Sequence, residues 1–334
     1  MQLNLLKTLV KSILRIITAL AIVLGVLAAC YWIWRPGSNG PLPAFSDNAI
    51  WLGHGWLGDD DWFNRNKRDT ADFRDADKCA ALLQKLRDNG IATVYPHLCP
   101  AQLNGRIAPC DHEQVERFLD IADQCGIKVV PWIGGILDDS ARPADENWRS
   151  NFLSSVDELL KTHPRLAGVQ VNIEPMPCGN ADFIKLLEEL RTVTTGRTLG
   201  VAAYPPPTRW HPFSDVHWDL DYIHQVACSC DQLSVMMYDT AIPLEKFYIA
   251  LVKRWTRELS ETLHSTDCEL ILGIPAYEDA NVGYHHPKVE NLSSALKGIA
   301  AAKPGDRISG FAIYCEWDMN ESKWEEWRKR AYGK

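Results

Sequence analysis

Short apolar runs alternate with segments of helical periodicity from Ser46 to the end of the chain, and no other feature limits the fold as strongly. This alternation is typical of βα units, whose strands form a parallel sheet. Eight such units can be counted, and eight are needed to close a barrel inside a ring of helices. The sequence therefore predicts an α/β fold, a (β/α)8 TIM barrel. The expected strands are Ala49–Gly53, Ile91–Pro96, Ile127–Ile133, Gly168–Glu174, Thr198–Tyr204, Leu233–Tyr238, Leu270–Pro275 and Ile308–Tyr314.

Helices are expected after the strands. Gly90 and Gly126 each separate a helical segment from the next strand, where a left-handed cap residue is favoured. The expected helices include Cys79–Asn89, Val115–Cys125, Trp148–Lys161, Phe183–Thr194, Leu244–Leu263, Leu292–Ala302 and Ser322–Tyr332. In barrel enzymes the active site lies at the C-terminal ends of the strands. That rule selects His54, Trp56, His97, Trp132, Glu174, Tyr204, Tyr238, Asp239, Tyr277, Tyr314 and Glu316.

Residues 1–35 have the pattern of a membrane anchor. Lys7, Lys11 and Arg15 precede a run from Ile16 to Trp34 that contains no charged residue. Such a run is long enough to span a bilayer, and basic residues before it favour a cytoplasmic N-terminus. The barrel is then expected in the cell envelope, on the exported side of the membrane.

The same segment has a second interpretation. Leu27-Ala28-Ala29-Cys30 matches a lipobox, so a lipoprotein signal with an acylated Cys30 is the alternative to an uncleaved anchor. Both interpretations leave the barrel outside the cytoplasmic membrane. Residues 36–46 are rich in proline and glycine, which predicts a linker before a barrel that covers residues 47–334.

Composition limits the partners. A formal net charge of -8 and a pI near 5.7 argue against a nucleic-acid partner, because phosphate binding requires clustered Lys and Arg. The 13 tryptophans suit a glycan instead, because aromatic faces stack on the apolar faces of sugar rings.

The cysteines do not predict a full set of disulfides. Of ten cysteines, Cys30 lies in the anchor, so an odd number remains for the barrel. Cys99 and Cys110 flank one loop and are candidates for a bridge. The spacing of Cys228 and Cys230 is too short for an ordinary zinc site, and neither a metal nor a cofactor is expected.

The strand from Gly168 to Glu174 is the most informative segment for chemistry. Side chains alternate between the two faces of a strand, so the apolar residues at positions 169, 171 and 173 would face the helices. Gln170, Asn172 and Glu174 would then point into the barrel, where an unpaired carboxylate is costly. This row of inward polar residues predicts a catalytic strand; the alternative is a polar network that lines the barrel.

Four segments together resemble glycoside hydrolase family 18. The strand that ends at Glu174 resembles the family's fourth strand, where an alternating aspartate-rich run ends in the catalytic glutamate. Lys128–Gly135 is similar to the third strand and its serine-x-glycine-glycine motif, with Trp132 in the serine position. Val235–Asp239 matches the methionine-x-tyrosine-aspartate of the sixth strand, and Leu272–Tyr277 matches the glycine-x-proline-x-tyrosine of the seventh.

The resemblance implies hydrolysis of a glycan that contains N-acetylhexosamine. In that family the substrate's acetamido oxygen attacks the anomeric carbon, and the reaction retains configuration. Glu174 would act as general acid and base, Asn172 would orient the acetamido group, and Tyr238 would donate to its oxygen. The expected substrate-binding residues are Asp239, Gln170, Trp132, Tyr204, Tyr277, Tyr314 and Trp56.

The sequence departs from the family pattern in three respects. Asn172, Gln170 and Ala167 stand where the family has aspartates, so the carboxylate relay that would tune the catalytic acid is missing. Asn-Ile-Glu is instead similar to the acid strand of the family 85 endo-β-N-acetylglucosaminidases. Tyr314 occupies the place of the eighth-strand tryptophan, with Trp317 nearby.

Two other functions remain open at this point. The main alternative is a non-catalytic carbohydrate-binding barrel at the cell envelope, and retention of Glu174 favours the enzyme. The third is a membrane-anchored assembly scaffold, which predicts no open cleft at the strand ends. His285 and His286 lie in a polar loop without identifiable ligand partners, which predicts solvent-exposed side chains. Residues 204–212 are rich in proline and predict either a glycan-binding rim or a packed loop.

Overall fold

The computed structural model describes residues 2–67, 69–98, 100–209, 215–279 and 283–332. By its internal contacts the chain forms two compact units, Met1–Pro36 and Gly37–Lys334.

The first unit is a single helix, α1 (Gln2–Ile33). Its part from Leu9 to Ile33 is long and apolar enough to cross a membrane, and it is the one helix of this kind in the described ranges. The boundary follows from the sequence, because Pro36 cannot continue a helix.

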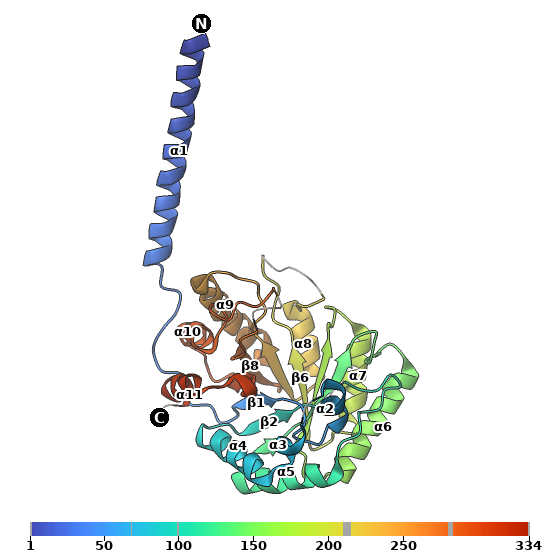
Figure 1. The fold of residues 1–334 in the computed structure, drawn as a ribbon. Coiled ribbons are helices and arrows are strands. Elements are labelled where there is room, and N and C mark those ends of the chain that lie inside the picture. The colour runs from blue at the N-terminus through green and yellow to red at the C-terminus, as the bar shows by residue number, and fades with distance from the viewer. Residues whose placement is uncertain (1, 68, 99, 210–214, 280–282, 333–334) are drawn as a thin grey trace. The chain divides into compact units, whose positions relative to one another are not determined.

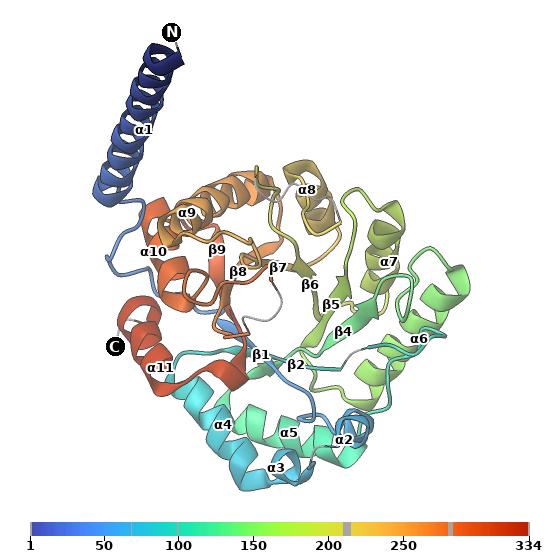
Figure 2. The same cartoon turned by 45° about the horizontal axis from the view of Figure 1, so that its top comes forward.

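The second unit is a parallel barrel (Figures 1 and 2). All strand pairs are parallel, and the order along the sheet is β3-β2-β1-β9-β8-β7-β6-β5-β4. Figure 2 shows the strands as a ring with helices around its outside. Each of the eight predicted strands is present, so the predicted (β/α)8 barrel is confirmed. The strands are β1 (Ala49–Leu52), β2 (Thr93–Pro96), β3 (Lys128–Val129), β4 (Trp132–Ile136), β5 (Gly168–Glu174), β6 (Thr198–Ala203), β7 (Gln232–Met236), β8 (Glu269–Pro275) and β9 (Ile308–Tyr314).

The ninth strand arises because the third barrel strand is divided in two. β3 pairs with β2, and β4 pairs with β5. Pro131 lies between the two halves and has no N–H to give to a ladder. A parallel bridge between His97 and Trp132 connects the two ends of the sheet, which closes the barrel.

The helices that cover the barrel begin at polar caps. The side chains of Asp75, Asp111, Asp145, Asn180 and Asp219 each accept a hydrogen bond from a backbone N–H in the first turn of the following helix. The main helices are α4 (Ala76–Asp88), α5 (His112–Cys125), α6 (Glu146–Thr162), α7 (Ala181–Arg191), α8 (Leu220–Cys228), α9 (Glu245–Thr262), α10 (Leu292–Ala302) and α11 (Glu321–Trp327), with two short ones, α2 (Asp60–Asn66) and α3 (Ala71–Arg74), after β1.

Two details of the helices bear on the sequence predictions. Gly126 ends α5 in the left-handed conformation, with φ 64°, as predicted. The nine-residue helix α8 was not among the helices named from the sequence. Its short amphipathic stretch follows a proline-rich loop, which hides its periodicity.

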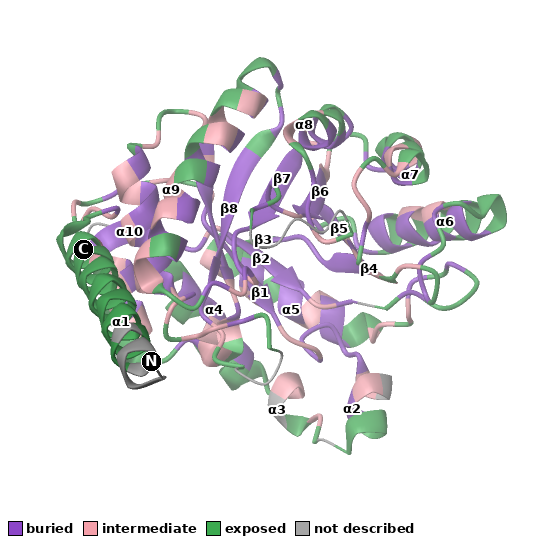
Figure 3. Cartoon of the chain, turned by 90° about the horizontal axis from the view of Figure 1, so that it is seen from above, coloured by how far each residue is buried: buried purple, intermediate pink, exposed green. Residues whose placement is uncertain are grey.

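The barrel has a core on each side of its strands. Figure 3 shows buried residues along the strands and exposed residues on the outer faces of the helices. Val169, Val171 and Ile173 lie in the core between strands and helices, so the predicted alternation of β5 is present. Inside the barrel, Trp51 Nε1 donates to Gln170 Oε1 at 2.7 Å, and Gln170 Nε2 donates to Ser234 Oγ at 3.2 Å.

The segment predicted to be a linker is partly bound to the barrel. Ser38 N donates to Lys297 O at 3.0 Å, and Leu42 N donates to Arg330 O at 3.0 Å. Leu42 is 9% exposed and joins the outer core. Proline and glycine content indicates a lack of helix or strand, but it does not show whether the backbone finds partners elsewhere.

The described cysteines are all free. The bridge expected between Cys99 and Cys110 falls on Cys99, which lies outside the described residues. Cys230 Sγ and Cys268 Sγ lie 3.7 Å apart, both buried, at the beginning of β7 and β8. The sequence did not indicate this pair.

Candidate active site

A cavity of about 600 Å³ opens at the C-terminal ends of the strands. Its size falls within the range of small-ligand sites. Of the residues named from the sequence, Glu174, Asn172, Tyr238, Asp239, Trp132, Tyr204, Tyr277 and Tyr314 line it. The barrel thus collects these side chains from six strand ends. An open cavity at this place is opposite to what the scaffold interpretation predicts.

Glu174 ends β5 and lines this cavity. Burial, with a smaller contribution from the negative charge of Asp239, raises the pKa of the Glu174 carboxyl to about 7. Removal from water disfavours the ionised form, and a nearby like charge adds to that effect. A carboxyl group with a pKa near neutral pH is present in both its protonated and its ionised form there, so it can both give and take a proton.

Asn172 lies two residues before Glu174 on the same face of β5 and also lines the cavity. Its Oδ1 is buried and has no hydrogen-bond partner in the structure. Leaving a buried acceptor without a partner costs about 1–3 kcal/mol of folding free energy. The N–H of a bound ligand could supply the missing hydrogen bond to Asn172 Oδ1. β4 approaches closely here, because a Cβ at Gly134 would lie 2.0 Å from Asn172 O. Only glycine fits that position, which gives a structural reason for the glycine pair of the third-strand motif.

Three tyrosines form one wall of the site. The rings of Tyr238 and Tyr314 are stacked, with centroids 5.4 Å apart and planes at 15°. Tyr277 packs edge-on against both, at 5.9 Å and 5.3 Å. Burial is the main reason that the pKa of Tyr238 and of Tyr314 is raised, so both phenols remain hydrogen-bond donors.

A buried polar chain supports Asp239 from behind. Tyr277 Oη donates to Asp239 Oδ1, and His285 Nδ1 lies 3.3 Å from the same oxygen. The same nitrogen, His285 Nδ1, lies 3.5 Å from Glu290 Oε2. The ring of His285 stacks on that of Tyr277, with centroids 3.8 Å apart. Thr240 donates to both Glu290 oxygens. Burial lowers the pKa of His285, but the two carboxylates outweigh burial and raise it overall.

The expected exposure of His285 was therefore wrong. His285 is 1% exposed, and its neighbour His286 is half-buried. The loop from Tyr277 folds back so that Ala241 N donates to Tyr284 O, which brings residue 285 beside Asp239. Sequence separation concealed this contact.

Five residues named from the sequence are not part of the cavity lining: His54, His97, Gln170, Trp56 and Glu316. Gln170 is fully buried and holds Trp51 and Ser234 inside the barrel, so its role there is support. Trp56 packs against Phe73 at 4.8 Å within the outer core, away from the sugar site for which it was proposed. Burial raises the pKa of Glu316 to about 7, but its side chain is not part of the lining.

Loop residues complete the cavity, and the sequence analysis did not assign them to it. They come mainly from the loops after β6, β8 and β9, where no periodic pattern marks a position. His217 Nδ1 lies 3.0 Å from Pro205 O, which holds the loop after β6 against itself. Trp210 of the predicted rim lies outside the described residues. The additional lining residues include Asp215, Val216, His217, Asp279, Tyr284, Trp317 and Asp318.

Two groups of side chains have the composition of metal ligands. The first is His54, Asp59 and His97, and the second is Asp239, His285 and Glu290; in each, the donor atoms lie within 4.8 Å of one another. The sequence analysis expected no metal, because neither group is close together along the chain.

A closed (β/α)8 barrel with a buried carboxyl group of raised pKa and an aromatic wall in its C-terminal cavity is the architecture of a barrel glycoside hydrolase. Residues 62–333 match the family model for glycosyl hydrolases family 18, and the chain therefore belongs to that family. This match confirms the resemblance seen in the four sequence motifs and the assignment to the glycoside hydrolases.

Solved structures agree with this fold. The Bacillus cereus spore cortex-lytic enzyme SleL superposes with a TM-score of 0.58 at 10% identity, over 88% of this chain and 76% of that one. A chitinase from Chromobacterium violaceum gives a TM-score of 0.58 at 13% identity, over 86% and 99%. A class V chitinase from Pseudomonas fluorescens gives 0.54 at 13% identity, over 86% and 99%. Such low identities support the shared fold alone, and no curated protein matches the chain.

Proposed function

We propose that this glycoside hydrolase cleaves glycans that contain N-acetylhexosamine, with Glu174 as general acid and base. The observation that carries the proposal is the pairing, on one strand face, of a carboxyl group whose pKa is raised by burial to about 7 and an unsatisfied amide oxygen two residues away. The first group suits proton transfer, and the second suits recognition of an acetamido N–H.

The reaction proceeds in two stages. Glu174 gives its proton to the glycosidic oxygen while the substrate's acetamido oxygen attacks the anomeric carbon, so that an oxazolinium ion forms and the leaving sugar departs. Asn172 Oδ1 accepts from the acetamido N–H, and Tyr238 donates to the acetamido oxygen. Glu174, now ionised, then takes a proton from water as that water attacks the anomeric carbon. Retention of configuration follows from the two successive displacements.

The arrangement of Asn172 before Glu174 is the family 85-like feature of this site. An Asp at 172 would place a second negative charge beside Glu174 and couple the two titrations. With Asn172, the second charge comes from Asp239 on another strand end. The aromatic lining from Trp132, Tyr204, Tyr277 and Tyr314 supplies surfaces on which sugar rings stack.

The place of action follows from the N-terminal segment. Helix α1 holds the enzyme at the membrane, and Lys7, Lys11 and Arg15 keep its N-terminus in the cytoplasm. The barrel therefore acts in the cell envelope on the exported side.

Glu174→Gln tests the proposal, and Glu316→Gln is a matched control. Both carboxyl groups have a pKa raised to about 7 by burial, but only Glu174 lines the cavity. With the full-length enzyme in detergent and an aryl N-acetylglucosaminide, kcat should fall by roughly 10²–10⁴-fold in Glu174→Gln and stay unchanged in Glu316→Gln.

The leaving group provides a second readout of the same assignment. Without a general acid, the rate should depend much more strongly on the acidity of the departing phenol, because no proton reaches the glycosidic oxygen. Wild-type dependence in Glu174→Gln, or loss of activity in Glu316→Gln instead, would show that the acid lies elsewhere.

A further inference from the structure

Outside the cavity lining, His54, Asp59 and His97 meet at the same end of the barrel. His54 follows β1, and His97 follows β2 and bridges to Trp132 of β4. Asp59 is the cap of α2, five residues after His54. The glycosidase mechanism uses none of the three side chains, although the ring of His97 packs edge-on against that of Trp132 at 4.5 Å. Since Trp132 lines the cavity, the group lies directly behind the cavity wall.

The distances suit one shared ion. The three donor atoms lie within 4.8 Å of one another, and His54 Nδ1 lies 3.0 Å from Asp59 Oδ2. The two imidazole rings have centroids only 3.6 Å apart. Two ligand atoms that each lie about 2.1 Å from one zinc ion at a tetrahedral angle are separated by about 3.4 Å. Donor atoms at the 4.8 Å limit would have to approach each other by about 1.4 Å to reach that geometry.

The chemistry of the donors also suits an ion. Neutral imidazoles and a carboxylate bind first-row divalent metals. Two imidazoles this close repel when both are protonated, whereas a cation held by the lone pairs joins them.

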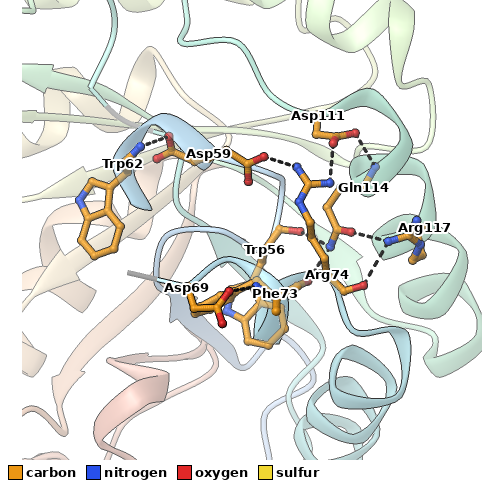
Figure 4. Close-up of polar contacts among 11 residues, drawn as sticks. Trp56, Asp59, Trp62, Asp69, Phe73, Arg74, Asp111, Gln114 and Arg117 are labelled. Atoms are coloured by element: carbon orange, nitrogen blue, oxygen red, sulfur yellow. Dashed lines mark hydrogen bonds and ion pairs between the residues drawn. The ribbon is translucent and has the colours of Figure 1, made fainter. Parts of the chain in front are cut away.

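The segment that carries Asp59 is held in place before any ion binds. Figure 4 shows Arg74 reaching Asp111, and Gln114 reaching the backbone of Phe73. Arg74 also forms an ion pair with Asp60, the residue that follows the proposed metal ligand Asp59. On the far side, Trp62 stacks on His54 at 4.1 Å and 11°, which orients the imidazole. Pre-oriented ligands reduce the entropy cost of metal binding.

The second group of potential ligands is a weaker candidate for an ion. Glu290 already accepts hydrogen bonds from Thr240 at both oxygens. His285 lies between two carboxylates, which raise its pKa and favour the imidazolium over the metal-binding form. A substitution of His285 can therefore serve to distinguish metal binding at the second group from binding at the first.

We propose that His54, Asp59 and His97 bind one divalent transition ion of the zinc class behind the cavity wall that Trp132 forms. Three protein donors leave a tetrahedral ion one open position, which water or a ligand oxygen can occupy. The ion would tie the ends of β1 and β2 to α2 and brace Trp132 in the cavity wall. This site is independent of the acid and base chemistry assigned to Glu174.

The experiment uses untagged full-length protein in detergent, freed of metal by a chelator and then titrated with Co²⁺ and, separately, Zn²⁺. We expect one ion per chain, visible d–d absorption from nitrogen-ligated Co²⁺, and a higher melting temperature with Zn²⁺. His54→Gln and His97→Gln should weaken metal binding by at least about 100-fold, because each variant loses one of the three side chains that bind the ion directly.

Asp59→Asn separates a ligand role from a folding role. Asn caps helices as well as Asp does, so α2 should remain intact while binding weakens by about 10–100-fold. His112→Gln is the matched control, because His112 Nδ1 contacts His163 Nε2 at 3.2 Å on the helical side of the barrel. That variant should bind the ion as the wild type does.

Three results would overturn the proposal. The first is a wild-type protein that binds neither Co²⁺ nor Zn²⁺ stoichiometrically. The second is unchanged binding in His54→Gln, whose half-buried side chain can be replaced with little risk to folding. The third is loss of binding in His285→Gln with retention in His54→Gln, which would place the ion in the second group.

Discussion

The Asp239 carboxylate and the Glu174 carboxyl share one cavity, and the charge of Asp239 adds to burial in raising the pKa of Glu174 to about 7. In many barrel enzymes a second acid on the same strand would supply such an effect. In this chain that strand carries Gln170 and Asn172 instead. The like charge that acts on Glu174 is Asp239, which follows β7 and is contacted by Tyr277 and His285.

Asp239→Asn should move the alkaline limb of kcat/KM to lower pH. The general acid must be protonated, and removal of the nearby negative charge lowers the pKa of Glu174 toward its usual value. A pH profile on an aryl N-acetylglucosaminide would measure the shift. Asp279→Asn is the control, because Asp279 lines the same cavity but does not contribute to the Glu174 shift. An alkaline limb that stays in place would remove Asp239 from this role.

His285→Gln should move the same limb in the opposite direction. The carboxylates of Asp239 and Glu290 raise the pKa of His285 and so favour its imidazolium form, which offsets part of the negative charge that Glu174 experiences. Without the imidazolium, the pKa of Glu174 should rise and activity should persist to higher pH. His286→Gln, one residue along the loop, should leave the profile unchanged. A downward shift in His285→Gln would contradict a compensating charge.

Asn172→Ala should lower kcat by about 10²-fold or more, as the loss of a transition-state hydrogen bond does in other enzymes. Asn172→Asp should keep activity with an altered pH profile, because the carboxylate still accepts from the acetamido N–H. Replacement of the substrate's acetyl group by trifluoroacetyl, which weakens the attacking oxygen, should slow the wild type strongly. Wild-type turnover by Asn172→Ala would rule out substrate assistance through this residue.

Protease added outside intact spheroplasts should remove the barrel, because Lys7, Lys11 and Arg15 before an uncharged run favour a cytoplasmic N-terminus. A cytoplasmic marker protein should remain intact in the same sample. If the barrel survives until the membrane is permeabilised, the proposed orientation is wrong.

Cys230 and Cys268 should form a disulfide when the barrel is exposed to a thiol oxidant such as oxidised glutathione. Their sulfurs lie 3.7 Å apart, and each thiol gives up one proton and one electron as the S–S bond forms. A bridge over 38 positions should stabilise the fold by about 3–4 kcal/mol. Mass spectrometry after alkylation of the unfolded protein should find two fewer modified thiols, and Cys228→Ser should not change that difference. Full alkylation of both would refute the bridge.

The barrel and the inward-facing polar residues of β5 could be predicted from the sequence, because they depend on short-range patterns. Alternation along residues 168–174 decides which side chains face inward, and that periodicity follows from strand geometry alone. The position of Glu174 at a strand end then follows from the rule for barrels. The division of the third strand at Pro131 was less visible, because both halves are apolar.

Contacts between distant segments were decided only by the tertiary structure. Helix α9 and strand β8 separate Asp239 from His285 along the chain, and nothing in the local pattern indicates that the loop after β8 folds back to bury the histidine. Trp56 follows a strand like the lining residues, yet it packs into the outer core, because its loop carries it away from the cavity. His54 and His97 follow two different strands, and only the tertiary structure brings their rings into contact.

The sequence by itself determined the class of fold, the polar face of β5 and the apolar N-terminal segment, because each depends on neighbouring residues and a fixed backbone period. Only the tertiary structure decided which loops complete the cavity, which charge raises the pKa of Glu174 and which histidines meet. Those properties depend on distances through space and on exclusion of water, and both arise only when the barrel closes.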